Sequence, residues 1–311
     1  MQRQKYIFFL HLHHWRLTTN VLWNHGDVMR YVHFSPDGQQ RLLGVLQGPT
    51  ITSLGDFSLE ALLAAGTDLT AFANASIGAG TKYPVDSVTW LPPLTRPGKI
   101  ICVGLNYADH TKESKFEPQT YPTFFPRFDS SLIGHLAPMI RPLVSDSLDF
   151  EGELAVILGR GGRHISRAHA LDCVAGYSIF NDGSVREYQF KAPQWTIGKN
   201  FDGTGAFGPT FVTADELPAG GAGLKLETRL NGKVVQTANT SDLVFDVASL
   251  IAIISEAITL APGDVIVSGT PAGVGWARDP KLIMRHGDVC EVEIEGLGVL
   301  KNIVQDEQPT N

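Results

Sequence analysis

The chain has 311 residues, a formal net charge of −7 and a hydrophobic fraction of 43%. These values are typical of a globular protein with a sizeable core, and the lack of a basic cluster argues against a nucleic-acid partner. Cys102, Cys173 and Cys290 are widely spaced in apolar surroundings, which predicts reduced core residues of a cytoplasmic protein and no zinc or disulfide framework.

The first 28 residues differ in composition from the sequence that follows them. The apolar run 6–10 is too short to cross a bilayer, and histidines follow it directly. The longer apolar core and the small-residue cleavage site of a signal peptide are both absent. We therefore expect residues 1–28 to be a disordered or loosely packed extension with no membrane partner, and the folded chain to begin at Met29.

Residues 29–96 are expected to form a small N-terminal α/β domain. Short strands surround a turn at Pro36-Asp37-Gly38, and residues 59–65 have the pattern of a short helix. A segment rich in proline and glycine, residues 92–98, then reads as a linker to the next domain.

The remaining chain, residues 97–304, has short β-branched strands separated by glycine and proline turns, and residues 305–311 are predicted to be a frayed tail. Two helices are expected: one over residues 167–174 capped by Ser166, and one from Ser241 or Asp242 to about Leu260. Many strands, few helices and no regular βαβ alternation predict a β-rich α+β fold with mixed sheets.

Acidic residues alternate at the start of one predicted strand. Asp149, Glu151 and Glu153 lead into the apolar run 154–158, and on a strand their side chains would share a face, about 7 Å apart. Three like charges in a partly dry site require a cation or shifted pKa values, and hard oxygen ligands suit Mg²⁺, Mn²⁺ or Ca²⁺. The alternative is an acidic strand edge that faces solvent.

Four further segments combine polar residues with glycine or an apolar strand. His110 and Glu113 are three residues apart, so on a helical turn they can form a dyad in which the carboxylate orients a general base; a surface pair is the alternative. Asp182 ends the apolar strand 177–180 and can bring another carboxylate to the same cation.

Arg186 and Gln189, at spacing i, i+3, can present a cation and an amide to one ligand. Lys199 can neutralise an anionic substrate or stabilise a developing enolate. The segment 268–275, Ser-Gly-Thr-Pro-Ala-Gly-Val-Gly, offers close backbone N–H groups to an anion, together with the Thr270 hydroxyl. It is not a Walker A motif, because no Gly-Lys-Ser/Thr follows.

Taken in order, these segments resemble the fumarylacetoacetate hydrolase superfamily over residues 99–304: G-L-N-Y-A-D-H-x-x-E, D-F-E-G-E-L-A-V-I, N-D-x-S-x-R-E-Y-Q, G-K-N-F-D and S-G-T-P-A-G-V-G. The resemblance implies a central β-roll of mixed sheets, a smaller N-terminal domain and a homodimer. It also implies one Mg²⁺ or Mn²⁺, with Ca²⁺ as an alternative, held by Glu151, Glu153 and Asp182. Asp149 then has a supporting role.

The resemblance further assigns the catalytic roles to the dyad His110–Glu113 and to Lys199. The residues that it implies for substrate binding are Thr270, Arg186, Gln189, Tyr107 and Arg127. Arg127 lies where many relatives carry a lysine, so it is either a bidentate clamp for a substrate carboxylate or a structural surface residue.

The function implied by the resemblance is a hydrolase that cleaves a C–C bond in a β-diketo acid of the acylpyruvate or fumarylpyruvate type. Metal-bound enolate chemistry would be combined with a water activated by His110 and Glu113, on a small anionic oxo-acid substrate. Decarboxylation or isomerisation of oxaloacetate-like or oxo-tricarboxylic acids, and hydrolysis of diketo-deoxy sugar acids, are alternatives. A non-catalytic metal-binding homologue is a further alternative, against which the complete set of site residues argues.

Overall fold

The computed structural model describes residues 29–113 and 120–309, apart from the side chains of residues 110–112. The predicted extension 1–28 and the end of the tail lie outside the described residues. The described strands are β1 (Arg30–Ser35), β2 (Leu42–Gln47), β3 (Thr50–Gly55), β4 (Lys82–Pro84), β5 (Thr89–Leu91), β6 (Ile100–Gly104), β7 (Thr123–Arg127), β8 (Leu132–Ile133), β9 (Met139–Arg141), β10 (Leu148–Asp149), β11 (Gly152–Leu158), β12 (Val174–Asp182), β13 (Ser184–Val185), β14 (Gly205–Thr213), β15 (Lys225–Leu230), β16 (Lys233–Asn239), β17 (Val265–Val267), β18 (Val289–Ile294) and β19 (Gly298–Asp306).

The α-helices of the described residues are short and few: α1 (Leu59–Ala64), α2 (Leu69–Ser76), α3 (Ala108–Glu113), α4 (Arg186–Gln189) and α5 (Val247–Ala257). None of them is long and apolar enough to cross a membrane. The predominance of strands in mixed sheets confirms the predicted β-rich α+β class.

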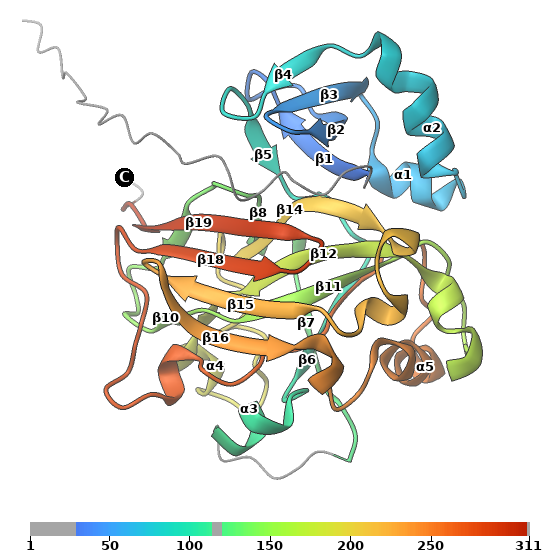
Figure 1. Ribbon diagram of the computed structural model, residues 1–311. Coiled ribbons are helices and arrows are strands. Elements are labelled where there is room, and N and C mark those ends of the chain that lie inside the picture. The colour runs from blue at the N-terminus through green and yellow to red at the C-terminus, as the bar shows by residue number, and fades with distance from the viewer. Residues whose placement is uncertain (1–28, 114–119, 310–311) are drawn as a thin grey trace, which may run out of the picture.

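Most strands belong to one sheet of twelve, ordered β4-β3-β2-β1-β14-β12-β11-β17-β6-β7, with β5 paired to β1 and β8 paired to β14. The N-terminal strands lie at one end of the molecule with α1 and α2, at the top of Figure 1. β1 pairs antiparallel with β14, so these strands extend the large sheet. The domain boundary near residue 96 stays a prediction.

A second sheet of five strands, β16-β15-β18-β19-β9, lies in front of β11 and β12 in Figure 1. The main core lies between this sheet, the large sheet and α5. It includes Leu154 and Val156 of β11, Leu226 of β15 and Val292 of β18. The two layers therefore share one large core, and a pair of short strands, β10 and β13, forms a third, separate sheet.

Strand β11 is buried on both faces. Leu154, Val156 and Leu158 contribute to the main core, whereas Ala155 and Ile157 contribute to a second core behind the sheet. This explains the continuous apolar run in the sequence, since a central strand of a covered sheet has no solvent face. By the same alternation, Glu153 lies on the face of Ala155, next to the second core.

Two helix predictions were wrong in extent. Residues 167–173 form two 3₁₀ turns, and Ser166 makes no side-chain cap. The long helix begins at Val247 with Asp246 as its cap, not at residues 241–242. The cause is tertiary, because the backbone N–H groups of Val244 and Phe245 donate to Asn106 and hold this segment out of the helix.

Candidate metal and active site

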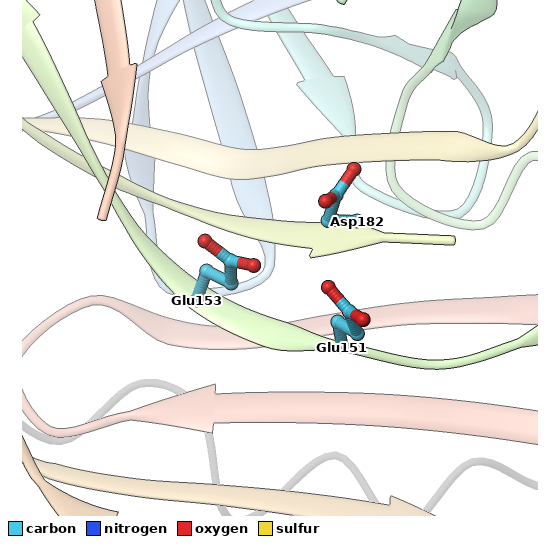
Figure 2. Close-up of side chains that lie close together, drawn as sticks. All are labelled: Glu151, Glu153 and Asp182. Carbon is cyan, nitrogen blue, oxygen red and sulfur yellow. The ribbon is translucent and has the colours of Figure 1, made fainter. Parts of the chain in front are cut away.

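Three buried carboxylates converge at the ends of two neighbouring strands. Glu151 directly precedes β11, Glu153 lies within it, and Asp182 is the last residue of β12. One oxygen from each lies within 4.8 Å of the others. Figure 2 shows the three side chains close together on the two neighbouring strands. The prediction that a distant strand contributes the third carboxylate matches this geometry.

The strand register brings the three groups together. In the antiparallel pair, Glu153 lies opposite Phe180, and the Asp182 N–H donates to the Glu151 carbonyl at 2.8 Å. Glu151 and Asp182 are therefore neighbours across the ladder, whereas Glu153 lies two residues further along the same face. The number of residues between Glu151 and Asp182 does not reveal that they are neighbours. The register of β11 against β12 places them side by side.

Lysine and arginine side chains hold the Glu151 and Asp182 carboxylates. The Lys199 Nζ lies 2.8 Å from Glu151 Oε2 and 2.7 Å from Asp182 Oδ2, and Arg186 Nη1 lies 2.6 Å from Glu151 Oε1. Glu153 differs, since its hydrogen bond is from the Gly269 N–H at 2.5 Å and no ion pair to it occurs among the described residues. A buried carboxylate without a counter-ion is the feature that a bound cation would satisfy.

The three clustered carboxylates also change the pKa values of Glu153 and Lys199. Burial, followed by the charges of Asp182 and Glu151, raises the pKa of Glu153 well above its usual range. Burial alone would lower the pKa of Lys199, but the Asp182 and Glu151 charges outweigh it and raise that pKa. The set of three hard oxygen donors with one unmatched charge fits a divalent ion such as Mg²⁺ or Mn²⁺.

A cavity of about 350 Å³ is lined by Glu151, one of the three carboxylates. Its polar lining comes from Glu113, Glu151, Arg186, Gln189, Lys199 and Thr270. Its apolar lining is large and partly aromatic, and consists of Val103, Leu105, Phe125, Phe190, Trp195, Val274, Trp276 and Ala277. The volume, together with Arg186 and Lys199 in the lining, suits a small anionic ligand with an apolar portion.

The two tryptophans were not among the predicted site residues, although Trp276 directly follows the glycine-rich segment 268–275. Trp195 packs directly on Gly104, where an added Cβ would lie 2.4 Å from the ring. The ring also meets Phe125 edge-on at a centroid distance of 5.5 Å. Gly104 thus permits an indole to form the wall of the cavity beside Lys199.

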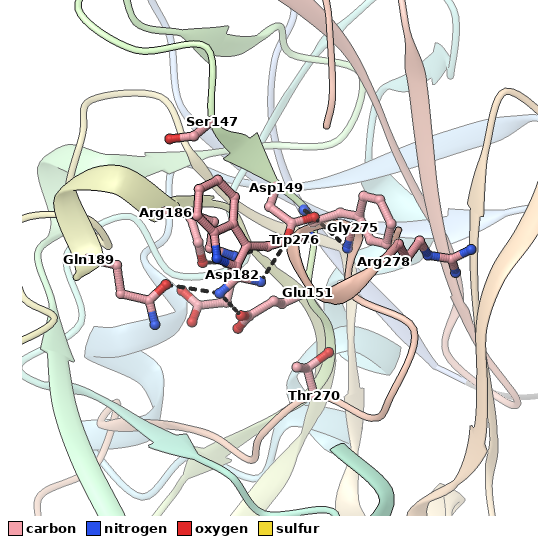
Figure 3. A network of polar contacts seen from close by, with 12 residues as sticks. Ser147, Asp149, Glu151, Asp182, Arg186, Gln189, Thr270, Gly275, Trp276 and Arg278 are labelled. Carbon is pink, nitrogen blue, oxygen red and sulfur yellow. Dashed lines mark hydrogen bonds and ion pairs between the residues drawn. The ribbon is translucent and has the colours of Figure 1, made fainter. Parts of the chain in front are cut away.

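Asp149 does not share a strand face with the two glutamates, contrary to the initial expectation. It belongs to β10, which pairs with β13, and β11 begins only at Gly152. Its carboxylate accepts the N–H groups of Gly275 and Trp276 at 2.8 and 2.9 Å and the Nε–H of Arg186 at 2.8 Å (Figure 3). Asp149 therefore joins the glycine-rich loop to the arginine that holds Glu151, in the supporting role predicted for it.

The predicted dyad lies on α3, at the edge of the cavity. Glu113 lines the cavity and accepts the Gly273 N–H at 2.8 Å, which connects α3 to the glycine-rich loop. The His110 side chain lies outside the described residues, so the dyad itself stays a prediction. Arg186 and Gln189 both line the cavity, as expected, and Arg186 Nη1 donates to Gln189 Oε1 at 2.9 Å.

Arg127 is neither a surface residue nor part of the cavity lining. Its side chain is buried behind Asp182 and forms an ion pair with that carboxylate. Its other donors reach Gly183 O at 3.1 Å, Thr204 Oγ1 at 2.9 Å and Ser131 Oγ at 3.2 Å. The expectation of a clamp on a substrate carboxylate is corrected by this placement, because the guanidinium is used to orient Asp182.

Tyr107 is also placed away from the cavity lining. It is 2% exposed and forms an isolated β-bridge with Leu243. Burial raises the pKa of its hydroxyl, with smaller contributions from Glu153 and Asp242. A direct substrate contact by Tyr107 is therefore not supported by its position in the described structure.

Replacement of Arg127 tests its assigned role. Arg127→Met removes the guanidinium donors to Asp182 while keeping a side chain of similar length, and is expected to weaken Mn²⁺ binding by roughly 10–100-fold. The KM for substrate should stay close to that of the wild type. Calorimetric Mn²⁺ titration and steady-state kinetics measure both quantities, with Arg127→Lys as the charged control. A raised KM with unchanged Mn²⁺ affinity would instead indicate a substrate contact.

The structure combines a β-rich fold with a buried triad of carboxylates that could hold a metal ion. The chain belongs to the fumarylacetoacetate hydrolase family, since the family described as "Fumarylacetoacetate (FAA) hydrolase C-terminal" matches residues 99–305. It is 43% identical over 222 residues to the oxaloacetate tautomerase Fahd2a, mitochondrial, of Rattus norvegicus, and this match covers 71% of each chain.

Two solved structures share the fold over 90% of this chain and all of theirs. One is the fumarylacetoacetate hydrolase of Exiguobacterium antarcticum, with a TM-score of 0.79 and 35% identity. The other is the maleylpyruvate hydrolase of Sphingobium sp. SYK-6 in complex with manganese(II) ion and pyruvate, with a TM-score of 0.76 and 28% identity. These likenesses confirm the family and the β-roll architecture expected from the motifs.

Proposed function

We propose that the chain is a divalent-metal-dependent tautomerase that interconverts the keto and enol forms of a small 2-oxo dicarboxylic acid of the oxaloacetate type. The choice rests on the 43% identity to relatives named oxaloacetate tautomerases, over 71% of both chains. It agrees with the cavity, whose lining includes Glu151 together with the cations Arg186 and Lys199. Among the functions considered from the sequence, the isomerase alternative is thus preferred to C–C hydrolysis.

The residues of the cavity can carry this reaction. Arg186 and Gln189 offer donors to a substrate carboxylate, and Lys199, with a third N–H beyond its two carboxylate contacts, can stabilise a developing enolate oxygen. A Mg²⁺ or Mn²⁺ ion held by Glu151, Glu153 and Asp182 would supply further positive charge. We assign to His110, oriented by Glu113, the transfer of a proton from C3 of the acid to its C2 oxygen.

Hydrolysis of a C–C bond in an acylpyruvate is the second candidate. The specific observation in its favour is that Glu113 of the predicted dyad lines the cavity, where a water could be activated. A solved relative is named maleylpyruvate hydrolase and contains manganese and pyruvate. The two candidates differ in their need for a water and in the bond broken, so a substrate panel separates them.

The panel contains oxaloacetate, acylpyruvates, fumarylpyruvate and diketo-deoxy sugar acids, each with Mg²⁺, Mn²⁺ or EDTA. We expect metal-dependent acceleration of enol loss from oxaloacetate, followed by ultraviolet absorbance against an enzyme-free control. Pyruvate release from an acylpyruvate at a higher kcat/KM would favour the hydrolase. If the metal-loaded protein turned over none of these acids, the enzyme assignment would fail in favour of a binding protein.

His110→Ala tests the proton carrier. Tautomerisation, and any hydrolysis, should fall by roughly 10²–10⁴-fold, the usual contribution of a general acid–base residue. Metal-dependent decarboxylation of oxaloacetate should survive, because it needs neither a water nor this proton transfer. Unchanged tautomerisation and hydrolysis in the variant would show that the assigned base is wrong.

A homodimer and a cytoplasmic location stay predictions. The names of two relatives include the word mitochondrial. The location of this protein in its own cell therefore has to be measured directly. Light scattering of the purified protein measures its mass in solution, and a mass near 33.8 kDa, that of one chain, would contradict the dimer.

A further inference from the structure

A buried glutamine outside the predicted motifs joins the carboxylate strand to the glycine-rich loop. Gln236, on β16, is 2% exposed, and its amide contacts three groups: the Gly152 N–H, the Pro271 carbonyl and the Thr270 hydroxyl. We propose that Gln236 is a positioning residue that turns the Thr270 proton away from the cavity. Thr270 then presents only a hydrogen-bond acceptor to the ligand, and the site selects a ligand with an O–H group at that position.

Two backbone groups determine the orientation of the Gln236 amide. The Gly152 N–H can only donate, so the atom 3.0 Å from it must be Oε1. The Pro271 carbonyl can only accept, so the atom 2.9 Å from it must be Nε2. The flipped amide would place two donors together and two acceptors together in a buried site. The assignment therefore follows from the chemistry of its neighbours.

The orientation of the amide determines that of the Thr270 hydroxyl. Gln236 Nε2 donates to Thr270 Oγ1 at 2.9 Å, and the hydroxyl in turn donates its single proton to the Gly152 carbonyl at 3.0 Å. A threonine hydroxyl has one proton and two lone pairs. The proton and one lone pair are thus used within the protein. The second lone pair remains to accept a hydrogen bond.

Thr270 lines the cavity next to Glu151, so this lone pair is what the residue offers to a ligand. An ionised carboxylate has no proton and would be repelled by an acceptor, whereas an enol or alcohol O–H can donate to it. The earlier expectation that the Thr270 hydroxyl would hold the substrate carboxylate is therefore replaced by a preference for a hydroxyl group.

The donors of the cavity come from another part of its wall. Gln189 Oε1 accepts from Arg186 Nη1 at 2.9 Å, so the Gln189 Nε2 is left to donate. In the view of Figure 3, Gln189 and Thr270 lie on different sides of Glu151. A ligand with a carboxylate toward Gln189 and a hydroxyl toward Thr270 matches both. The enol of a 2-oxo dicarboxylic acid has this O–H, and its keto form does not.

The test measures binding and does not depend on turnover. Its two probes are 2-hydroxysuccinate and 2-fluorosuccinate, which differ by one O–H donor, titrated calorimetrically into Mg²⁺-loaded protein. One hydrogen bond gives an expected preference of roughly 3–10-fold for the hydroxy acid. The inference rests on the proposed function only for the class of ligand, a small dicarboxylic acid.

Three variants separate positioning from folding. Thr270→Val should bring the hydroxy-to-fluoro affinity ratio to about one, and Thr270→Ser, which retains the hydroxyl, should restore it. Gln236→Met, which leaves the hydroxyl free to rotate, should reduce the ratio toward one as well. A merely structural role for Gln236 would weaken both ligands equally and leave the ratio unchanged. Melting curves of all three variants show whether the fold is retained.

The outcomes distinguish this inference from the proposed function. A wild-type ratio of one, or a ratio unchanged in Thr270→Val, overturns the role of Thr270, and a ratio unchanged in Gln236→Met overturns that of Gln236. The tautomerase proposal stays intact in each case. If the wild-type protein prefers the hydroxy acid but does not tautomerise oxaloacetate, only the proposed tautomerase function is overturned. If neither acid binds, the dicarboxylate ligand class is wrong and both proposals fall.

Discussion

Replacing Glu153 with glutamine is expected to abolish Mn²⁺ binding and, in the presence of EDTA, to raise the melting temperature of the protein. Glutamine keeps an oxygen for the Gly269 N–H but removes the charge that has no ion pair among the described residues. The substitution removes one candidate metal ligand, and it also removes the charge repulsion of the Glu153 carboxylate with Glu151 and Asp182. Each kcal/mol of relieved repulsion raises the melting temperature by about 2–4 °C in a domain of this size.

The same carboxylate predicts a pH dependence. Its pKa is raised well above the ordinary 4.5 by burial and then by the charges of Asp182 and Glu151. A group with a higher pKa in the folded state stabilises the protein fully below its unfolded value, and this contribution is lost as the pH rises through the folded value. Metal-free protein should therefore lose stability above about pH 4.5, and Glu153→Gln should lose less.

Metal affinity should change in the opposite direction, since the ligands must be deprotonated to bind and protons compete at low pH. Thermal melts with EDTA and with Mn²⁺, over a pH series, measure both effects. Glu256→Gln, at the exposed end of α5, is the matched control and should change neither. Wild-type Mn²⁺ affinity in Glu153→Gln would show that Glu153 is not a ligand.

Lys199→Met is expected to have the second large effect. It leaves Glu151 and Asp182 buried without the cation that they share, and removing one partner of a buried pair costs about 3–5 kcal/mol. It also removes the proposed donor to the enolate, so kcat/KM should fall by roughly 10²–10³-fold. Kinetics and denaturant unfolding, with and without Mn²⁺, measure the two losses separately.

Added Mn²⁺ should restore part of the stability of Lys199→Met, because it neutralises the carboxylates, but should not restore the rate. Lys233→Met, on an exposed position of β16, is the control for loss of a lysine. Recovery of full activity on metal addition would limit Lys199 to a structural counter-ion and would contradict its assigned part in the reaction.

Local sequence predicted the elements whose determinants lie within a few residues. The helix at 59–65, for example, was predicted from its own pattern. The 241–260 helix was predicted too long, because hydrogen bonds to Asn106 hold residues 244–245 in place. Such a contact, between residues 139 apart, leaves no local pattern.

The sequence by itself determined the family and the β-rich class, and through the family motifs it named the three convergent carboxylates, whereas strand alternation alone pointed to Asp149 in place of Asp182. Tertiary structure alone decided what the neighbouring polar groups do: Arg127 holds Asp182, and Asp149 anchors the loop at Gly275. It also decided which groups contact the Thr270 hydroxyl, among them the Gln236 amide. The physical reason is that a hydrogen bond depends on which atoms face each other. The pairing of strands that are distant in the sequence brings these atoms together, and local sequence does not show that pairing.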